Sequence, residues 1–428
     1  MKKIRKDLCI VLVVCLALTM ALSACGSKSG DSGDAKTEGG GTVKIGCVFP
    51  LSGTNALLGG ESLRGAELAV DELNANGGLW GNQVELVIAD APDVTAGQTE
   101  TERLITKDQL PLIFGSYSSG LANVNSDVAA RYDIPFFELG GIGSDVMEKG
   151  YEYLWRTCCD AIAFGTTQAD FYEQACREEL GVKKEDAKIT ITHEDSLFGT
   201  SVAEAAEKQF EKLGYTKANI KVLPYSAASV DLSTVILDSK AYNPDVFLAI
   251  SYVNDAILLG RQAKELNFQP PVWIGGGAGW AMKDTQDGIG KDIYGIYDVD
   301  WPQYAMNRDN VQGLDEYIQL YKDKFGEEPR SGHSLGDYVG AQMMFKVLQN
   351  AGSFDKDAIK EAASKIDDPI GTYTGGWGCK FDERGQNIQA PAVMFMWGKD
   401  ALEAVWPENF AVTDLVLPMP TWAEKAAL

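Results

Sequence analysis

Histidine, the residue type most often used for proton transfer and metal binding, occurs only twice in this 428-residue chain, at His193 and His333. A His-rich metal site is therefore excluded. Asp-Ser-Leu follows His193-Glu194, so the zinc-binding pattern HExxH is absent. The segment GSYSSG at 115–120 fails the nucleophile pattern GxSxG because Tyr117 stands at the serine position. We predict neutral surface or capping roles for both histidines and a protein that is not an enzyme, with no metal and no cofactor.

Charge and composition exclude further classes. The chain has 38 Lys and Arg against 61 Asp and Glu, a formal net charge of −23, which argues against a nucleic-acid partner because phosphates must be neutralised by basic side chains. Hydrophobic residues make up 45% and charged residues 23%, as in an ordinary globular protein. A chain of this length predicts two or three domains.

The N-terminus has the three parts of an export signal. Four basic residues lie among the first six, an apolar run covers Leu8–Leu22, and Leu-Ser-Ala-Cys closes it at Cys25. This ending resembles a bacterial lipobox, in which the cysteine is lipidated and begins the mature chain; an ordinary signal peptide or short anchor is the alternative. Residues 26–41 contain no large apolar side chain and predict a flexible tether. We therefore expect a signal at 1–24, a lipidated tether at 25–41 and an extracytoplasmic domain anchored to the cell membrane.

Five cysteines remain after Cys25, and they form a poor disulfide framework because their number is odd and no CxxC pair occurs. Adjacent Cys158 and Cys159 either form a vicinal disulfide or are two small buried residues, and we favour the second interpretation.

The folded part alternates short β-branched segments with amphipathic helical ones. Strands are predicted at 43–49, 84–89, 111–114 and 134–137, with helices between them, and a second such series covers 153–275. This alternation is typical of parallel βαβ units, so we predict an α/β fold with two open parallel sheets of similar size. Ligands of such sheets bind beyond the carboxyl ends of the strands.

Five segments resemble a known family, the type I periplasmic binding proteins of the leucine/isoleucine/valine-binding group. They are VKIGCVFPLSGTNALLGGESLRGAELAVDELNANGGLWGNQVELVIAD, LPLIFGSYSSGLA, DIPFFELGGIGS, HEDSLFGTSVAEA and PDVFLAISYVNDAILLGRQAKELNF, and the likeness runs in order from residue 43 to about residue 350.

The resemblance implies two lobes joined by crossing hinge segments, at 42–158 plus 301–370 and at 159–300 plus 371–428. It implies a monomer that closes on a small polar solute, such as an amino acid or amide, and delivers it to the permease subunits of an ABC transporter. A ligand-sensing receptor subunit of the same fold is the alternative, and a lipoprotein amidase or hydrolase is a third.

The resemblance also implies ligand-binding residues. Ser119 aligns with a serine that binds a ligand carboxylate, next to Ser118; capping of the following helix is the alternative for both. Gly140 aligns with a residue that offers backbone groups, while Ile142 replaces a threonine whose hydroxyl bond would be lost. Further positions are the aromatic residues Phe198 and Tyr252 and, with less weight, Leu58, Tyr117 and Trp301.

The main departure from the family is Gly277, where amino-acid binders place an acidic residue that holds the ligand ammonium group. Glu138, at the end of a predicted strand, is a candidate to supply this charge instead. Its alternative is a structural ion pair with Arg156 or Arg131. The identity of the solute is therefore open, with an amide, a cationic compound or another small polar solute as alternatives to a branched-chain amino acid.

Overall fold

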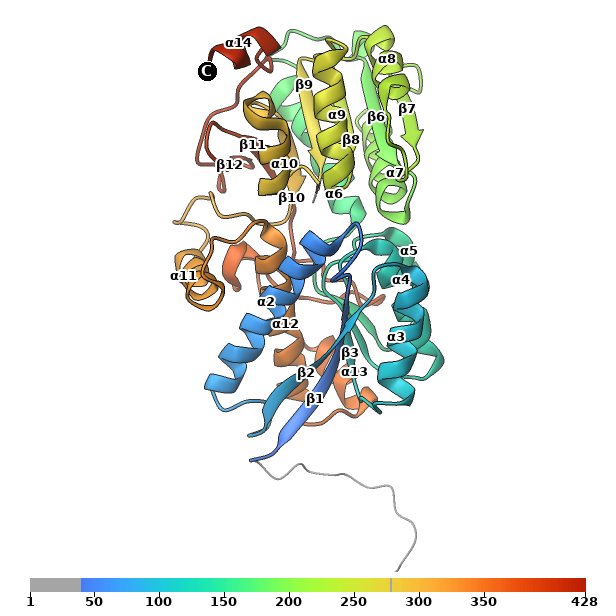
Figure 1. Cartoon of the computed structure of the whole chain (residues 1–428), viewed down its shortest axis with the longest axis vertical. Coiled ribbons are helices and arrows are strands. Elements are labelled where there is room, and N and C mark those ends of the chain that lie inside the picture. Colours follow the sequence, from blue (N-terminus) through green and yellow to red (C-terminus); the bar gives the residue numbers. More distant parts are fainter. Residues whose placement is uncertain (1–39, 278) are drawn as a thin grey trace, which may run out of the picture. The chain divides into compact units, whose positions relative to one another are not determined.

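The computed structural model describes residues 40–277 and 279–428 (Figure 1). Every element described below lies within Glu38–Leu428. The predicted signal, Cys25 and nearly all of the predicted tether lie outside the described residues. Among the residues described, no helix is both long and apolar enough to cross a membrane.

The first sheet has five strands in the order β2-β1-β3-β4-β5, and all its pairs are parallel. Its strands are β1 (Thr42–Phe49), β2 (Gln83–Asp90), β3 (Ile113–Gly115), β4 (Phe136–Glu138) and β5 (Leu154–Arg156). The connections contain helices α2 (Ala56–Ala75), α3 (Val94–Thr106), α4 (Ser119–Arg131) and α5 (Ser144–Glu148). The three short strands β3, β4 and β5 are buried along their whole length, which explains why most of their residues are apolar.

The second sheet has seven strands in the order β12-β11-β10-β9-β8-β6-β7. Its parallel strands are β6 (Ile189–Glu194), β7 (Ile220–Tyr225), β8 (Val246–Ile250), β9 (Val272–Gly276) and β10 (Tyr297–Asp300). Helix α6 (Ala161–Phe171), which continues as a π-helical turn (Tyr172–Cys176), precedes β6. The helices between these strands are α7 (Leu197–Lys212), α8 (Ser233–Tyr242), α9 (Val253–Glu265) and α10 (Lys283–Ile289).

The prediction of two open parallel sheets is confirmed, and the second sheet carries in addition an antiparallel edge that was not predicted. Strands β11 (Val393–Trp397) and β12 (Leu402–Trp406) add to the second sheet in antiparallel fashion. Only four residues join these two strands, and a connection that short can link antiparallel neighbours but not parallel ones.

Three further helices, α11 (Leu314–Phe325), α12 (Gly332–Ala351) and α13 (Lys356–Ser364), precede β11, and α14 (Trp422–Ala427) ends the chain. In the described part of the chain, three segments connect elements of one sheet to elements of the other: residues 157–160, 301–313 and 365–392. Asn387 binds the first of these segments, because its side-chain amide donates to the Thr157 carbonyl over 2.7 Å. The predicted buried state of Cys158 and Cys159 is confirmed, since both are buried and free.

Helices α2 and α12 lie side by side (Figure 1) because a glycine stands at their contact. A Cβ atom at Gly65 would lie 1.9 Å from the Ser334 carbonyl oxygen. This contact matters for the rest of the molecule, because α12 begins one residue before His333.

We expect Gly65→Ala to lower the free energy of unfolding by about 1–3 kcal/mol, because the new methyl group must push α12 away from α2. Urea unfolding followed by circular dichroism measures this. Gly60→Ala is the matched control on the same helix, since a Cβ there meets no atom within 4 Å; it should leave stability unchanged or raise it by up to about 1 kcal/mol. Equal effects of the two substitutions would contradict the proposed packing.

Candidate ligand-binding site

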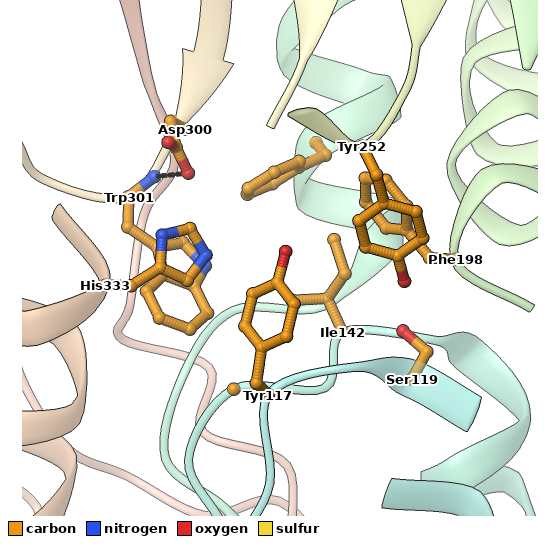
Figure 2. A pocket seen from close by; sticks show the side chains of 10 residues that line it. Tyr117, Ser119, Ile142, Phe198, Tyr252, Asp300, Trp301 and His333 are labelled. Carbon is orange, nitrogen blue, oxygen red and sulfur yellow. Dashed lines mark hydrogen bonds between the residues drawn. The ribbon is translucent and has the colours of Figure 1, made fainter. Parts of the chain in front are cut away.

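A cavity lies where loops from both sheets meet (Figure 2). The first sheet supplies the loops after β3 and β4, and the second supplies α6, α7, the start of α9 and the end of β10. The lining residues are Tyr117, Ser119, Gly140, Ile142, Phe164, Phe198, Tyr252, Asp300, Trp301 and His333. Most of them follow the carboxyl ends of strands, which is where an open α/β sheet places its ligands.

Seven residues predicted from the sequence lie together in this lining: Tyr117, Ser119, Gly140, Ile142, Phe198, Tyr252 and Trp301. Four others do not line it. Ser118 caps α4, with its Oγ accepting from the Leu121 N–H over 3.4 Å, and Leu58 packs against Tyr117 in a small apolar cluster. Glu138 and Gly277 are not among the lining residues either.

Ser119 connects two loops of the first sheet. Its Oγ accepts a 2.9 Å hydrogen bond from the Gly143 N–H, so the loop after β3 is joined to the loop after β4. A hydroxyl group that accepts one hydrogen bond still has its own proton to donate. Ser119 can therefore offer a donor to a ligand while it holds the Gly143 loop in place.

Glu138 accepts hydrogen bonds from both of these loops. Its Oε1 accepts hydrogen bonds from the N–H groups of Ser116, Gly140 and Gly141 over 2.7, 2.8 and 2.6 Å. Burial raises the pKa of this carboxyl group, while the three backbone donors act in the opposite direction. Arg156 does not bond to Glu138 and instead donates to the carbonyls of Gly141 and Gly143.

Gly277 has no room for a side chain. Its φ is +78°, its N–H donates to Asp298 Oδ1 over 3.0 Å, and a Cβ atom would lie 2.7 Å from the ring of Phe164. The acidic residue that the family resemblance places here is therefore replaced by a ring that enters the cavity from α6.

Rings form most of the cavity wall. The ring centroids of Trp301 and His333 lie 4.6 Å apart, and those of His333 and Tyr117 lie 5.3 Å apart. The ring centroids of Phe198 and Tyr252 lie 5.2 Å apart. The hydroxyl of Tyr117 points into the cavity (Figure 2) and has no hydrogen-bond partner in the described structure. It is a buried polar group that a ligand can satisfy.

The surface or capping role predicted for the histidines is wrong. His333 is only 4% exposed, and burial lowers its pKa to about 3, so the ring is neutral. His193 is also buried, at 6% exposure, with Nδ1 2.8 Å from the Glu194 carbonyl oxygen. The first half of α12 is buried on all sides and therefore has no polar stripe that would have indicated the position of His333.

The sequence interpretation also missed Phe164 and Asp300. Asp300 ends β10 and is fully buried; its Oδ1 accepts from the Trp301 N–H over 2.7 Å, and its Oδ2 from the Gln303 side chain over 3.0 Å. Burial raises its pKa to about 7, although both hydrogen bonds act against this shift. The sequence does carry a signal that could have indicated Asp300. Two aspartates lie two positions apart in Tyr-Asp-Val-Asp-Trp, next to the predicted crossing segment near residue 301.

Comparisons with known proteins agree on one family. The family model described as periplasmic binding protein matches residues 42–400. Leu/Ile/Val-binding protein homolog 7 of Brucella melitensis is 37% identical over 377 residues, covering 88% of this chain and 94% of that protein.

Two solved structures share the fold. LivJ of Streptococcus pneumoniae, a branched-chain amino acid binding protein in complex with isoleucine, has a TM-score of 0.71 at 23% identity, over 86% of this chain and 100% of its own. A solute-binding protein of Rhodopseudomonas palustris in complex with 3,4-dihydroxybenzoic acid has a TM-score of 0.71 at 17% identity, over 90% and 99%.

The role of Glu138 can be tested on the ligand-free protein. We expect Glu138→Ala to lower the free energy of unfolding by at least about 2 kcal/mol, because three buried N–H groups lose their acceptor. Glu138→Gln keeps an acceptor oxygen and should cost less than half as much, as measured by urea unfolding. A Glu138→Gln variant with unchanged stability and greatly weakened ligand binding would instead favour the direct ligand contact predicted from the sequence.

Proposed function

Because the chain belongs to the type I periplasmic binding proteins, in their leucine/isoleucine/valine-binding group, we propose that it captures a small polar solute and delivers it to an ABC permease. Members of this family bind solutes outside the cytoplasm and are not enzymes. The proposed solute is an amino acid, an amide or a related compound.

One observation supports this proposal most strongly: a buried cavity receives side chains from both sheets. A solute in this cavity would touch residues of both lobes, which we place at 42–158 plus 301–370 and at 159–300 plus 371–428. A ligand that contacts both lobes favours the arrangement in which they are closed together. The closed arrangement would then be the form that a permease distinguishes from the empty one.

The polar groups of the cavity suit a solute with oxygen or nitrogen atoms. Ser119 lies in the first turn of α4, where backbone N–H groups favour a carboxylate or carbonyl oxygen. The unpartnered hydroxyl of Tyr117 adds a second polar contact. The Brucella relative's name refers to leucine, isoleucine and valine, which is consistent with a solute of this size and kind.

Binding is tested by thermal shift and calorimetry with amino acids, amides, polyamines and small aromatic compounds. A solute at 100 times its Kd should add about 2.7 kcal/mol to the stability of the protein. We expect Ser119→Ala and Tyr252→Ala each to weaken binding at least about tenfold, the equivalent of 1.4 kcal/mol. Ser119→Ala should also lower the ligand-free melting temperature, because the Gly143 N–H loses its acceptor.

Val230→Ala, at a residue that is 88% exposed, is the matched control for this experiment and should bind normally. Normal binding by both site variants would show that the cavity is not the binding site. A solute recovered chemically unchanged from the complex, together with loss of its uptake on gene deletion, separates a transport protein from a sensor or an enzyme.

We also propose that Cys25 carries a lipid that anchors the chain to the outer face of the cell membrane. We expect Cys25→Ser to move the protein from the membrane fraction to the soluble fraction, measured by fractionation and fatty-acid labelling. A nearby substitution outside the lipobox, Ser27→Ala, serves as the control and should stay bound. Lipid labelling that persists in Cys25→Ser would refute the proposed anchor.

A further inference from the structure

Asp300 is the only charged residue among the ten that line the cavity. Figure 2 places its carboxylate near Trp301 and His333, on the side of the cavity opposite Ser119. Each carboxylate oxygen accepts one hydrogen bond from the protein, so each keeps capacity for another.

Within the described residues, no positively charged side chain lines the cavity beside Asp300. None of the lining residues is a lysine or arginine, and His333 is neutral. Asp298 adds a second buried carboxyl group on the same face of β10, and its Oδ2 has no partner in the described structure. A buried carboxylate without a counter-charge is costly, because it has lost its water without gaining an opposite charge.

The rings around Asp300 offer the second contact that a cation prefers. The faces of Trp, Tyr and Phe attract cations electrostatically, most strongly where water is excluded. Trp301 and Tyr117 flank His333, and Tyr252 and Phe198 continue the wall on the far side (Figure 2). The cavity thus combines one carboxylate, several ring faces and no cation.

We propose that the solute carries a nitrogen cation, and that Asp300 binds this cation within the ring-lined cavity. Asp300 would then take the place of the acidic residue that the family resemblance expects at position 277. This inference rests on the proposed function and deepens it by naming the chemical class of the solute. It separates this chain from binders of aromatic acids, whose ligands carry no positive charge.

The test compares matched probes with and without a nitrogen cation. Leucine is paired with 4-methylpentanoate, which lacks its ammonium group, and with 3-methylbutylamine, which lacks its carboxylate. Choline is paired with its uncharged analogue 3,3-dimethylbutan-1-ol, and benzoate represents an aromatic anion. Thermal shift and calorimetry are measured on the purified full chain and on Asp300→Asn and Asp298→Asn.

We expect only probes with a nitrogen cation to bind, and Asp300→Asn to weaken the binding of such a probe by about 100-fold or more. Asp298→Asn is the matched control: it removes a buried carboxylate from the same strand outside the lining and should change affinity less than about threefold. The ligand-free melting temperature of Asp300→Asn should rise, because an uncompensated buried charge is removed. An aspartate with a purely structural role would give a lower melting temperature instead.

Binding should also depend on pH. Burial raises the pKa of Asp300, and a cation binds to the ionised form of this group. Affinity should therefore fall, by up to tenfold per pH unit, as the pH is lowered below the raised pKa. Burial and the nearby Asp300 also raise the pKa of Asp298. Burial raises the pKa values of Tyr117, Tyr252 and Cys159 and lowers that of His333 to about 3. Asp300→Asn should show a flat profile between pH 5 and 8.

Two results would overturn the assignment of Asp300 and leave the proposed function standing. One is binding of 4-methylpentanoate, dimethylbutanol or benzoate as tightly as the matching cation. The other is unchanged cation binding by Asp300→Asn. If neither these probes nor the wider screen of amino acids, amides, polyamines and aromatic compounds yields a solute that binds, the inference and the proposed function both fail.

Discussion

A single carboxylate oxygen, Oε1 of Glu138, determines where the first sheet meets the cavity. Three N–H groups from two loops converge on it, and these loops carry Tyr117, Ser119, Gly140 and Ile142. Without this acceptor, three buried donors would be left unpaired and both loops would have to rearrange. The shape of this half of the cavity is therefore set by a residue that does not line it.

Arg156 extends this arrangement to the segments that join the two sheets. Its guanidinium group donates to the carbonyls of Gly141 and Gly143 and, over 2.6 Å, to the Gln386 side chain. Gln386 in turn donates to the Cys158 carbonyl. The loop that carries Gly140 and Ile142 is thus bonded to two of the crossing segments, so a relative movement of the sheets and a change at the cavity are physically connected.

Much of the fold could be predicted from the sequence because short apolar strands alternate regularly with amphipathic helices up to residue 275. Beyond residue 275 the sequence was less informative. Strand β10 carries two acidic residues, and the antiparallel edge depends on pairing between β10 and β11, two strands that lie far apart in the chain. The role of Glu138 could not be predicted because its partners are backbone groups, which any sequence provides. Asp300 and His333 were missed because both become buried only when distant segments pack together.

The close contact between Gly277 and Phe164 has a consequence for how specificity can change in evolution. A side chain at position 277 and a phenylalanine at position 164 exclude each other, since a Cβ atom would already lie 2.7 Å from the ring. An acidic residue can enter at 277 only after residue 164 has become smaller, so the two positions are epistatic. A change of ligand preference through an acidic residue at 277 would therefore require a second change at residue 164, and this pair resists single substitutions at that site.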